Sequence, residues 1–409
     1  MTPECRSCGA ELRRSFCDLG MSPLSNRFLD AGQLNAMEPF YPLHAYVCGE
    51  CLLVQLEQFE ATADIFSEYA YFSSYSESWL AHAERYVDAV VERFRIGSAN
   101  RVIEIASNDG YLLQYFSRRG VPVLGIEPAA NVARAAEKRG IPTLVEFFGA
   151  RCAERLVAER GRADLIVANN VLAHVPALND FVDGVRILLA PRGVATFEFP
   201  HLLRLMLGIQ YDTIYHEHFS YFSLLAAERV LARHGLRAFD VDELPTHGGS
   251  LRLYVCLADA AQPGRSKALD RVAADERAAG LEGLEAYATF KQRAEESKRA
   301  LLEFMIGAKR AGKRIAAYGA AAKGNTLLNY CGLRGDFIDY VVDLNPHKQG
   351  RYLPGTHIPI LHPDRIRETR PDYLLVLPWN LEEEVIRQNA GIRNWGGRFV
   401  LPIPAVRIV

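Results

Sequence analysis

The stretch VIEIASNDGYL at residues 102–112 decides the fold, because an apolar run passes directly into a turn of small and polar residues and then into a helical pattern. A strand that ends in such a turn before a helix is typical of the first unit of a doubly wound sheet. Ligands of such sheets bind at the carboxyl ends of the strands, where this turn approaches them most closely. The stretch therefore predicts both an α/β domain and the position of its ligand site.

Three further apolar runs follow the quoted stretch, and a helical pattern separates each from the next. They cover residues 123–126, 165–168 and 194–198. Strands that alternate with helices predict a doubly wound, Rossmann-like α/β domain. Residues 236–244 and 250–257, split by Pro245, are expected to close that sheet with an antiparallel edge hairpin.

A second α/β pattern begins after residue 313. Strands are expected at 314–318, 340–343 and 373–377, and a helix near Thr326. Residues 269–310, between the two patterns, are rich in Ala, Glu and Arg and lack proline, which predicts one or two solvated helices that link domains. An amphipathic pattern at 79–94 predicts a helix ahead of the first sheet. The fold class is thus α/β, with a central and a C-terminal Rossmann-like domain.

Length and charge narrow the class of protein. The chain has 409 residues, 49% of them apolar, and a formal net charge of −2. Such a length allows two or three domains, and so small a charge excludes a general polyanion-binding role, so we expect no nucleic-acid partner. No signal-like start and no membrane-length apolar run is present, so we expect a cytoplasmic protein without a membrane partner. Because no long coiled-coil seam is visible, we expect a monomer.

Four of the eight cysteines form two Cys-x-x-Cys knuckles. They are Cys5, Cys8, Cys48 and Cys51. Two knuckles complete a closed tetrahedron around zinc, with no open position for water, so we expect a structural Zn²⁺ site. Two incidental pairs or a redox dithiol are the alternatives. Cys17, Cys152, Cys256 and Cys331 stand singly in or beside apolar stretches and are expected to be core thiols.

The turn after the first strand carries acids where a phosphate-binding turn carries glycines. Glu104 or Asp109 could face the ammonium of a methionine group, while Ala106 and Gly110 would permit close approach. The dinucleotide alternative is disfavoured because G-x-G-x-x-G is missing and because the acid beside Asn108 would repel a pyrophosphate. The turn favours S-adenosylmethionine over NAD.

Further cofactor contacts are expected near the next strands. Glu127, at a strand tip before Pro128, could accept hydrogen bonds from both ribose hydroxyls. Phe148 could flank the adenine, although an aromatic residue there is as often part of the core. Asn169 directly follows the apolar run 165–168 and should face the same crevice. A purely structural role for Glu104 and Glu127 stays open.

The run YHEHFSYF at 215–222 is the densest group of titratable residues in the chain. Histidine titrates near neutrality, and a neighbouring carboxylate can fix its tautomer and raise its basicity, so proton chemistry is expected here. A metal bound by His216 and His218 is an alternative that lacks an obvious third ligand. A second alternative is one surface histidine and one packed histidine. His174, which follows the apolar run 165–168, could reach the same cleft.

Five motifs, in order along the whole chain, together carry a resemblance. They are the knuckle pair, EIASNDG at 104–110, YHEHF at 215–219, HGGSLR at 247–252 and YGAAAKGN at 318–325. The chain resembles the nucleotide-sugar C-methyltransferase family of deoxysugar pathways. The resemblance implies a zinc-binding domain at 1–66, an S-adenosylmethionine-binding domain at 67–260 and a C-terminal α/β domain at 261–409 that helps to bind the nucleotide-sugar. It also implies methyl transfer to C3 of a 4-keto-6-deoxy sugar, usually on dTDP.

The resemblance also implies roles for single residues. His218 would be the general base, with Glu217 and Tyr215 lining the sugar site and His174 nearby. Residues expected to contact the nucleotide-sugar are Tyr69, Tyr71, His247, Gly248, Lys323, Asn325 and Asp343. A C–H beside a ketone is acidic enough for a positioned base, and the resulting enolate can attack the sulfonium methyl in line. Sugar O- or N-methylation and a non-catalytic sugar-binding regulator remain alternatives.

Overall fold

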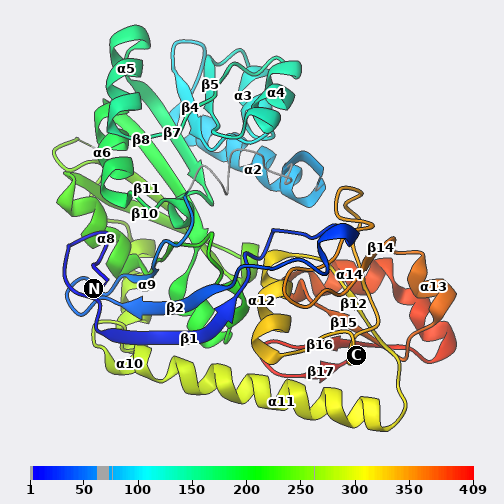
Figure 1. Cartoon of the computed structure of the whole chain (residues 1–409). Coiled ribbons are helices and arrows are strands. Elements are labelled where there is room, and N and C mark those ends of the chain that lie inside the picture. Colours follow the sequence, from blue (N-terminus) through cyan, green and yellow to red (C-terminus); the bar gives the residue numbers. More distant parts are fainter. Residues whose placement is uncertain (1–2, 62–72, 76, 262) are drawn as a thin grey trace.

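The computed structural model describes residues 3–61, 73–75, 77–261 and 263–409, and in this part of the chain three sheets are present (Figure 1). Tyr69 and Tyr71, which the sequence suggests as substrate contacts, lie outside the described residues. No helix in the described ranges is long and apolar enough to cross a membrane.

The central sheet has seven strands in the order β10-β11-β8-β7-β4-β5-β6. Their bounds are β4 (Val102–Ile105), β5 (Val123–Ile126), β6 (Thr143–Leu144), β7 (Ala163–Asn169), β8 (Leu189–Pro200), β10 (Leu236–Leu244) and β11 (Ser250–Leu257). Strands β4 to β8 run parallel, and β11 lies antiparallel between β8 and β10. The predicted strands and edge hairpin are therefore confirmed.

Helices cover both faces of this sheet, because alternate strand residues point to opposite sides. Ile103 and Ile105 join the core formed with α5 (Ala150–Arg160), α6 (Leu178–Leu188) and α8 (Leu224–Arg233). Val102 joins the opposite core, with α2 (Glu77–Phe94) and α3 (Leu113–Ser117). The chain winds toward β5 and β6 after β4 and returns to β7 on the other side. Doubly wound sheets bind their ligands at such a reversal, so a ligand site is expected at the carboxyl ends of β4 and β7; it is called the first crevice below.

The C-terminal sheet repeats this plan in the order β14-β13-β12-β15-β16-β17. Its elements are β12 (Ile315–Tyr318), β13 (Val341–Val342), β14 (Ile360–Leu361), β15 (Tyr373–Val376), β16 (Arg398–Leu401) and β17 (Arg407–Ile408), with α12 (Ala322–Cys331), α13 (Arg365–Thr369) and α14 (Glu382–Gln388). Only β17 runs antiparallel to its neighbour. The equivalent expected ligand site, at the carboxyl ends of β12 and β15, is called the second crevice below.

The N-terminal sheet is small and borrows a strand from the central part of the chain. Its order is β1 (Arg14–Ser22), β2 (Tyr41–Val47), β3 (Val54–Leu56) and β9 (Ser220–Tyr221), and all pairs are antiparallel. Leu53 packs into one core of the central domain, whereas Phe16 and Leu43 pack into the core of the C-terminal domain. The predicted domain bounds 1–66, 67–260 and 261–409 remain a prediction. The N-terminal sheet includes β9, so its strands are not confined to residues 1–66.

Helices between the two α/β domains are confirmed, but the described region holds three helices in place of one or two, and the longest has a buried face. The structure has α9 (Lys267–Ala278), α10 (Glu285–Ala288) and α11 (Phe290–Arg310), and α11 packs against β1 along one side of the molecule (Figure 1). The buried residues of α11 recur at helical spacing: Phe290, Ala294, Ser297, Leu301, Met305 and Ala308. Its many Arg, Lys and Glu residues lie on the other side and hide this stripe in the overall composition.

Candidate functional site

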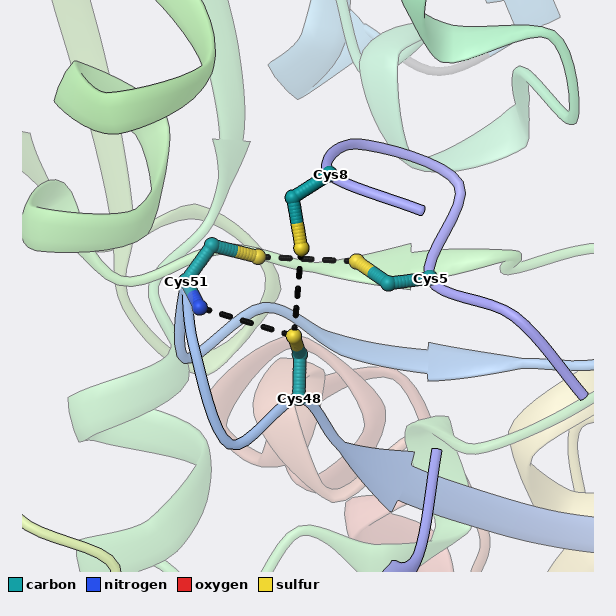
Figure 2. A group of neighbouring side chains, drawn as sticks. All are labelled: Cys5, Cys8, Cys48 and Cys51. Carbon is teal, nitrogen blue, oxygen red and sulfur yellow. Dashed lines mark hydrogen bonds between the residues drawn. The ribbon is translucent and has the colours of Figure 1, made fainter. Parts of the chain in front are cut away.

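The four predicted zinc ligands converge in the structure. Figure 2 shows the sulfur atoms of Cys5, Cys8, Cys48 and Cys51 pointing toward a common centre, all within 4.8 Å of one another. The Cys5–Cys51 and Cys8–Cys48 sulfur distances are 3.5 and 3.4 Å, so each knuckle faces the other. Zn–S bonds of about 2.3 Å would place the sulfurs ~3.8 Å apart, and four thiolates leave no position for water. The donor set therefore fits a structural zinc ion.

The remaining cysteines and the histidine pair do not form a second metal site. Cys17, Cys152, Cys256 and Cys331 are buried, as predicted for core thiols. In the described parts of the chain, no other group of three or more possible ligands comes together. His216 Nε2 lies 3.2 Å from the Pro42 carbonyl oxygen, a contact that holds this ring against the N-terminal sheet.

The turn after β4 has an alternating left-handed backbone. Ala106, Asn108 and Gly110 have φ values of 55°, 50° and 77°. Left-handed conformations at residues other than glycine cost energy and persist where the surroundings over-determine them, often at ligand sites. A Cβ on Gly110 would meet Ile141 Cγ1 at 2.9 Å, so glycine is required for this turn to pack. The sequence-predicted turn therefore forms the floor of the first crevice.

Glu127 follows β5 and is fixed by the same turn. Its Oε2 accepts a hydrogen bond from the Asn108 N–H at 3.0 Å, and its Oε1 accepts one from the Ala129 N–H at 2.9 Å. Burial raises the pKa of this carboxyl, whereas the two N–H groups act to lower it. Pro128 lies between Glu127 and the start of α4 (Ala130–Lys138). The carboxylate is thus held rigidly, and each oxygen keeps a second lone pair for a hydroxyl donor.

Glu104 and Asp109 differ in how their charges are compensated. Arg139 Nη1 lies 2.9 Å from Asp109 Oδ2, so the Asp109 charge is already paired. Glu104 is buried, its Oε2 has no partner among the described residues, and burial raises its pKa well above the ordinary value. Of the two predicted acceptors for an ammonium group, Glu104 is therefore the better candidate.

The other two predicted cofactor residues have different surroundings. Asn169 ends β7 at the crevice, and its buried Oδ1 has no partner within the described ranges. Phe148 packs edge-to-face on Phe181 at 5.4 Å, so its ring belongs to the core packing, and its contact with adenine stays a prediction. Glu104, Glu127 and Asn169 offer acceptors, which fit a cationic ligand with free hydroxyls better than a diphosphate.

The reaction cluster centres on His218. The Nδ1 atom of His218 lies 2.9 Å from the Thr213 carbonyl oxygen, and its Nε2 lies 2.8 Å from the Tyr215 hydroxyl oxygen. Because a carbonyl can only accept, Nδ1 carries the proton, and the neutral ring accepts from the Tyr215 hydroxyl at Nε2. The expectation that a carboxylate fixes this tautomer is wrong, since the Thr213 carbonyl does so. Burial, reinforced by His174, lowers the pKa of His218 well below its ordinary value.

His174 and the backbone of Glu217 lie next to His218, while their roles in the reaction stay predictions. The His174 ring lies edge-to-face with the His218 ring at 4.7 Å, and His174 Nδ1 lies 2.7 Å from the Glu217 carbonyl oxygen. Burial lowers the pKa of His174 to about 4. Glu217 Oε1 accepts from Asn26 Nδ2 at 2.7 Å, and its Oε2 has no partner among the described residues. Asn26 was not predicted, because a single asparagine in a loop gives no signal.

Replacing Glu217 with glutamine is expected to stabilise the protein increasingly as pH rises from 5 to 8. Glu217 is only 4% exposed, and burial raises its pKa from 4.5 to about 7. Folding thus favours the protonated acid, and its stabilising contribution is lost as pH rises through the folded pKa. Glutamine never ionises, so the gain should approach ~3 kcal/mol at pH 8. Urea unfolding of both proteins at each pH measures this, with the exposed Glu303→Gln as a control that should show no trend.

The C-terminal domain contacts the central part of the chain through Trp379, which follows β15, and Trp379 also contacts Lys323. Trp379 Nε1 donates to Asp212 Oδ2 at 2.7 Å, and Lys323 Nζ donates to Asn380 Oδ1 at 2.8 Å. The Lys323 ammonium also lies 4.9 Å from the centre of the Trp379 ring. A Cβ on Gly248 would meet Trp379 Cη2 at 2.7 Å. Asp212, Trp379 and Asn380 were not predicted, because their roles arise only when the two sheets meet.

The remaining predicted substrate residues lie at this junction or on its C-terminal side. His247 has a left-handed backbone with φ 55°, and burial lowers its pKa to about 4. Asn325 is buried, and neither side-chain polar atom has a partner in the described part of the chain. Asp343 accepts from the N–H groups of Ala320 and Asn345 at 2.7 and 2.8 Å, so it holds the turn after β12.

A buried ionic group beside the first crevice also escaped prediction. Glu198, near the end of β8, is bound by His82 at 3.0 Å and by Arg252. Burial acts to raise the pKa of Glu198, but the hydrogen bond from His82 and the charge of Arg252 lower it to about 2. His82 lies within an amphipathic helix pattern and Arg252 within a hairpin strand, so neither shows in the sequence as a partner of Glu198.

Comparisons with known proteins cover almost the whole chain. A putative zinc-binding domain matches residues 5–66, a methyltransferase domain matches 79–241, and a C-methyltransferase C-terminal domain matches 245–404. C-methyltransferase NovU of Streptomyces niveus is 36% identical over 406 residues, which are 99% of this chain and 96% of that protein.

Two weaker matches are partial. A ubiquinone biosynthesis O-methyltransferase of Rhodopseudomonas palustris is 31% identical over 102 residues, which are 24% of this chain and 38% of that protein. The crystal structure of magnesium protoporphyrin IX methyltransferase from Synechocystis has a TM-score of 0.33 and 12% identity, covering 43% of this chain and 78% of that one.

Proposed function

This chain belongs to the S-adenosylmethionine-dependent C-methyltransferases that carry an N-terminal zinc-binding domain, and from that premise we propose that it methylates a carbon beside the ketone of a nucleotide-linked sugar. The proposed substrate is a dTDP-linked 4-keto-6-deoxy sugar, methylated at C3. The observation that carries the proposal is the 2.8 Å contact between Tyr215 and His218, where a hydroxyl donor and a neutral base lie side by side.

This pair suits the removal of a proton from carbon. Enolate formation needs a base at the C–H and a donor at the neighbouring carbonyl oxygen, where negative charge develops. His218 Nε2 is the acceptor, and the Tyr215 hydroxyl can turn from the imidazole to the substrate oxygen. O- or N-methylation needs only deprotonation of a heteroatom, so it would leave the paired donor without a role.

The proton balance follows from the hydrogen bonds of His218. The C–H electron pair becomes the enolate, and the proton moves to Nε2, which makes the ring cationic. The Thr213 carbonyl then continues to accept from Nδ1–H and stabilises that cation. When bound, S-adenosylmethionine supplies an electrophilic methyl group on sulfur, which the enolate carbon attacks.

The donor and the nucleotide-sugar are assigned to the two crevices. Glu104, Glu127 and Asn169 present acceptors for the ammonium and the ribose hydroxyls of the methyl donor. Lys323, which lies in the first turn of α12 and not in a loop, presents the positive charge that a diphosphate needs. The Lys323 ammonium has no carboxylate within ion-pair distance in the described ranges, since Asn380 and the Trp379 ring are its neighbours. A diphosphate would therefore complete its charge compensation.

The test is to locate the transferred methyl group. The purified protein is incubated with S-adenosylmethionine carrying a ¹³C methyl group and dTDP-4-keto-6-deoxyglucose, and the product is studied by NMR. We expect the label bonded to the carbon beside the ketone, and we expect solvent deuterium to enter that carbon when the donor is omitted. dTDP-glucose, which has no ketone, should be neither exchanged nor methylated. A label bonded to oxygen or nitrogen would refute the proposal.

A further inference from the structure

One side chain connects the zinc site with the reaction cluster. Arg6 lies between the ligands Cys5 and Cys8 in the first knuckle. We propose that Arg6 is a positioning residue, through which the zinc centre fixes the two segments that carry His174 and His218. The inference rests on the proposed function for the roles of these histidines, and otherwise on the contacts of Arg6.

The guanidinium of Arg6 reaches both histidine segments. Its Nη1 donates to the Pro176 carbonyl oxygen at 3.0 Å, two residues after His174. Its central carbon lies 5.3 Å from the centre of the Phe219 ring, which directly follows His218. A guanidinium is planar, so one of its nitrogens can donate to a carbonyl while the face of the group packs on an aromatic ring. Arg6 thus ties together two segments that are far apart in sequence.

A third contact joins Arg6 to the strand that supports His218. Arg6 Nη2 donates to the Leu56 carbonyl oxygen, and the Leu56 N–H donates to the Phe219 carbonyl at 3.0 Å. β3, which ends at Leu56, pairs with β9, so that Gln55 lies opposite Ser220. The segment after His218 is therefore built onto a strand that Arg6 itself holds.

Gln55 links the same contacts to a zinc ligand. Its Nε2 lies 3.1 Å from Cys5 Sγ, and its Oε1 accepts from the Arg6 N–H at 2.9 Å. The amide therefore orients both the thiolate and the backbone of Arg6. Groups that orient the ligands of a metal site commonly set the geometry of those ligands and the affinity of the site for its metal. Displacement of Cys5 would move Arg6 with it.

The charge of Arg6 gives the zinc ion a direct part in this coupling. Arg6 is half-buried and directly follows the ligand Cys5, and no carboxylate is paired with it in the described part of the chain. A zinc ion with four thiolates is a net dianion, which compensates a partly buried cation beside it. Four protonated thiols are neutral and would not compensate the charge of Arg6. The loaded site should therefore hold Arg6, and through it the reaction cluster, in place.

The test replaces Arg6 with methionine and with lysine in the full-length, zinc-loaded protein. In Arg6→Met we expect about one zinc per chain and an unchanged far-UV spectrum, but displaced ¹⁵N imidazole signals of His174 and His218 in NMR. We expect kcat for methyl transfer to fall about 10- to 100-fold, with KM changed less than threefold, because a small misplacement of the base costs that much. Lysine keeps the positive charge and has a single donor nitrogen, so it should restore part of both the imidazole signals and kcat.

Arg13→Met is the matched control, since Arg13 lies in the same segment, is 76% exposed and pairs only with Glu11 among the described residues. It should leave the imidazole signals and kcat unchanged. Unchanged signals in Arg6→Met, loss of its zinc or its fold, or a lysine variant no better than methionine would each overturn the inference. The NMR readout needs no substrate. Displaced signals in Arg6→Met, together with a wild-type protein that methylates no keto-sugar, would refute the proposed function and leave the positioning role supported.

Discussion

His218→Asn is expected to lower kcat/KM for methyl transfer about 10²- to 10⁴-fold, the usual contribution of a general base. The asparagine amide can still donate to the Thr213 carbonyl, which His218 Nδ1 contacts at 2.9 Å, so the loop should keep its shape. What disappears is the lone pair at Nε2. Deuterium exchange at the carbon beside the ketone should therefore fall with methyl transfer, while binding of S-adenosylmethionine, measured by calorimetry, stays unchanged.

Two companion measurements separate the base from its partner. Tyr215→Phe removes the donor and should lower kcat/KM for methyl transfer about 10²- to 10³-fold, as loss of one oxyanion donor does.

In the wild type, burial keeps His218 neutral well below its ordinary pKa, so kcat/KM should stay level as pH falls through about 6.5 and decline only at lower pH. The exposed His362→Asn should match the wild type. Undiminished exchange in a folded His218→Asn protein would remove this residue from the base role.

The two Rossmann-like sheets could be predicted because their central strands are buried on both faces and read as continuous apolar runs, whereas the N-terminal sheet was not predicted. The runs at 165–168 and 194–198 mark β7 and β8 for this reason. β14, β16 and β17 were not predicted. β14 and β17 have two residues each and show no period, whereas β13, which is equally short, was predicted because it lies within the run 340–343. The buried stripe of α11 was also missed, because charged residues dominate its composition.

The site was predictable where its chemistry is concentrated in one run of sequence. Tyr215, Glu217 and His218 stand within four residues, and the acids of the cofactor turn follow directly on a strand. Contacts between distant segments leave no such pattern. Asn26 is 191 residues from Glu217, and Asp212 is 167 residues from Trp379. Pairs of this kind arise only from packing of the three sheets, so no local spacing could indicate them.

Cys48→Ser is expected to lose most of the bound zinc and to unfold at a temperature at least ~10 °C lower. A structural zinc ion contributes roughly 10–16 kcal/mol in small zinc domains, which rivals the whole stability of a typical protein. Serine cannot supply a thiolate, so the tetrahedron would lose a ligand that also accepts the N–H groups of Glu50 and Cys51. Metal analysis and scanning calorimetry measure both effects.

The damage should extend beyond the N-terminal segment, because that segment has no separate core. Its residue Leu53 packs with the central sheet, Phe16 packs with the C-terminal domain, and β3 pairs with the strand that follows His218. Cys17→Ser is the matched control: it is buried in the same sheet but outside the zinc cluster, so it should keep zinc and lose only a few kcal/mol. If Cys48→Ser keeps its zinc and melts like Cys17→Ser, the four thiols do not hold a structural metal. If it loses zinc but melts as one unit at a lower temperature, the metal stabilises the junction of all three sheets.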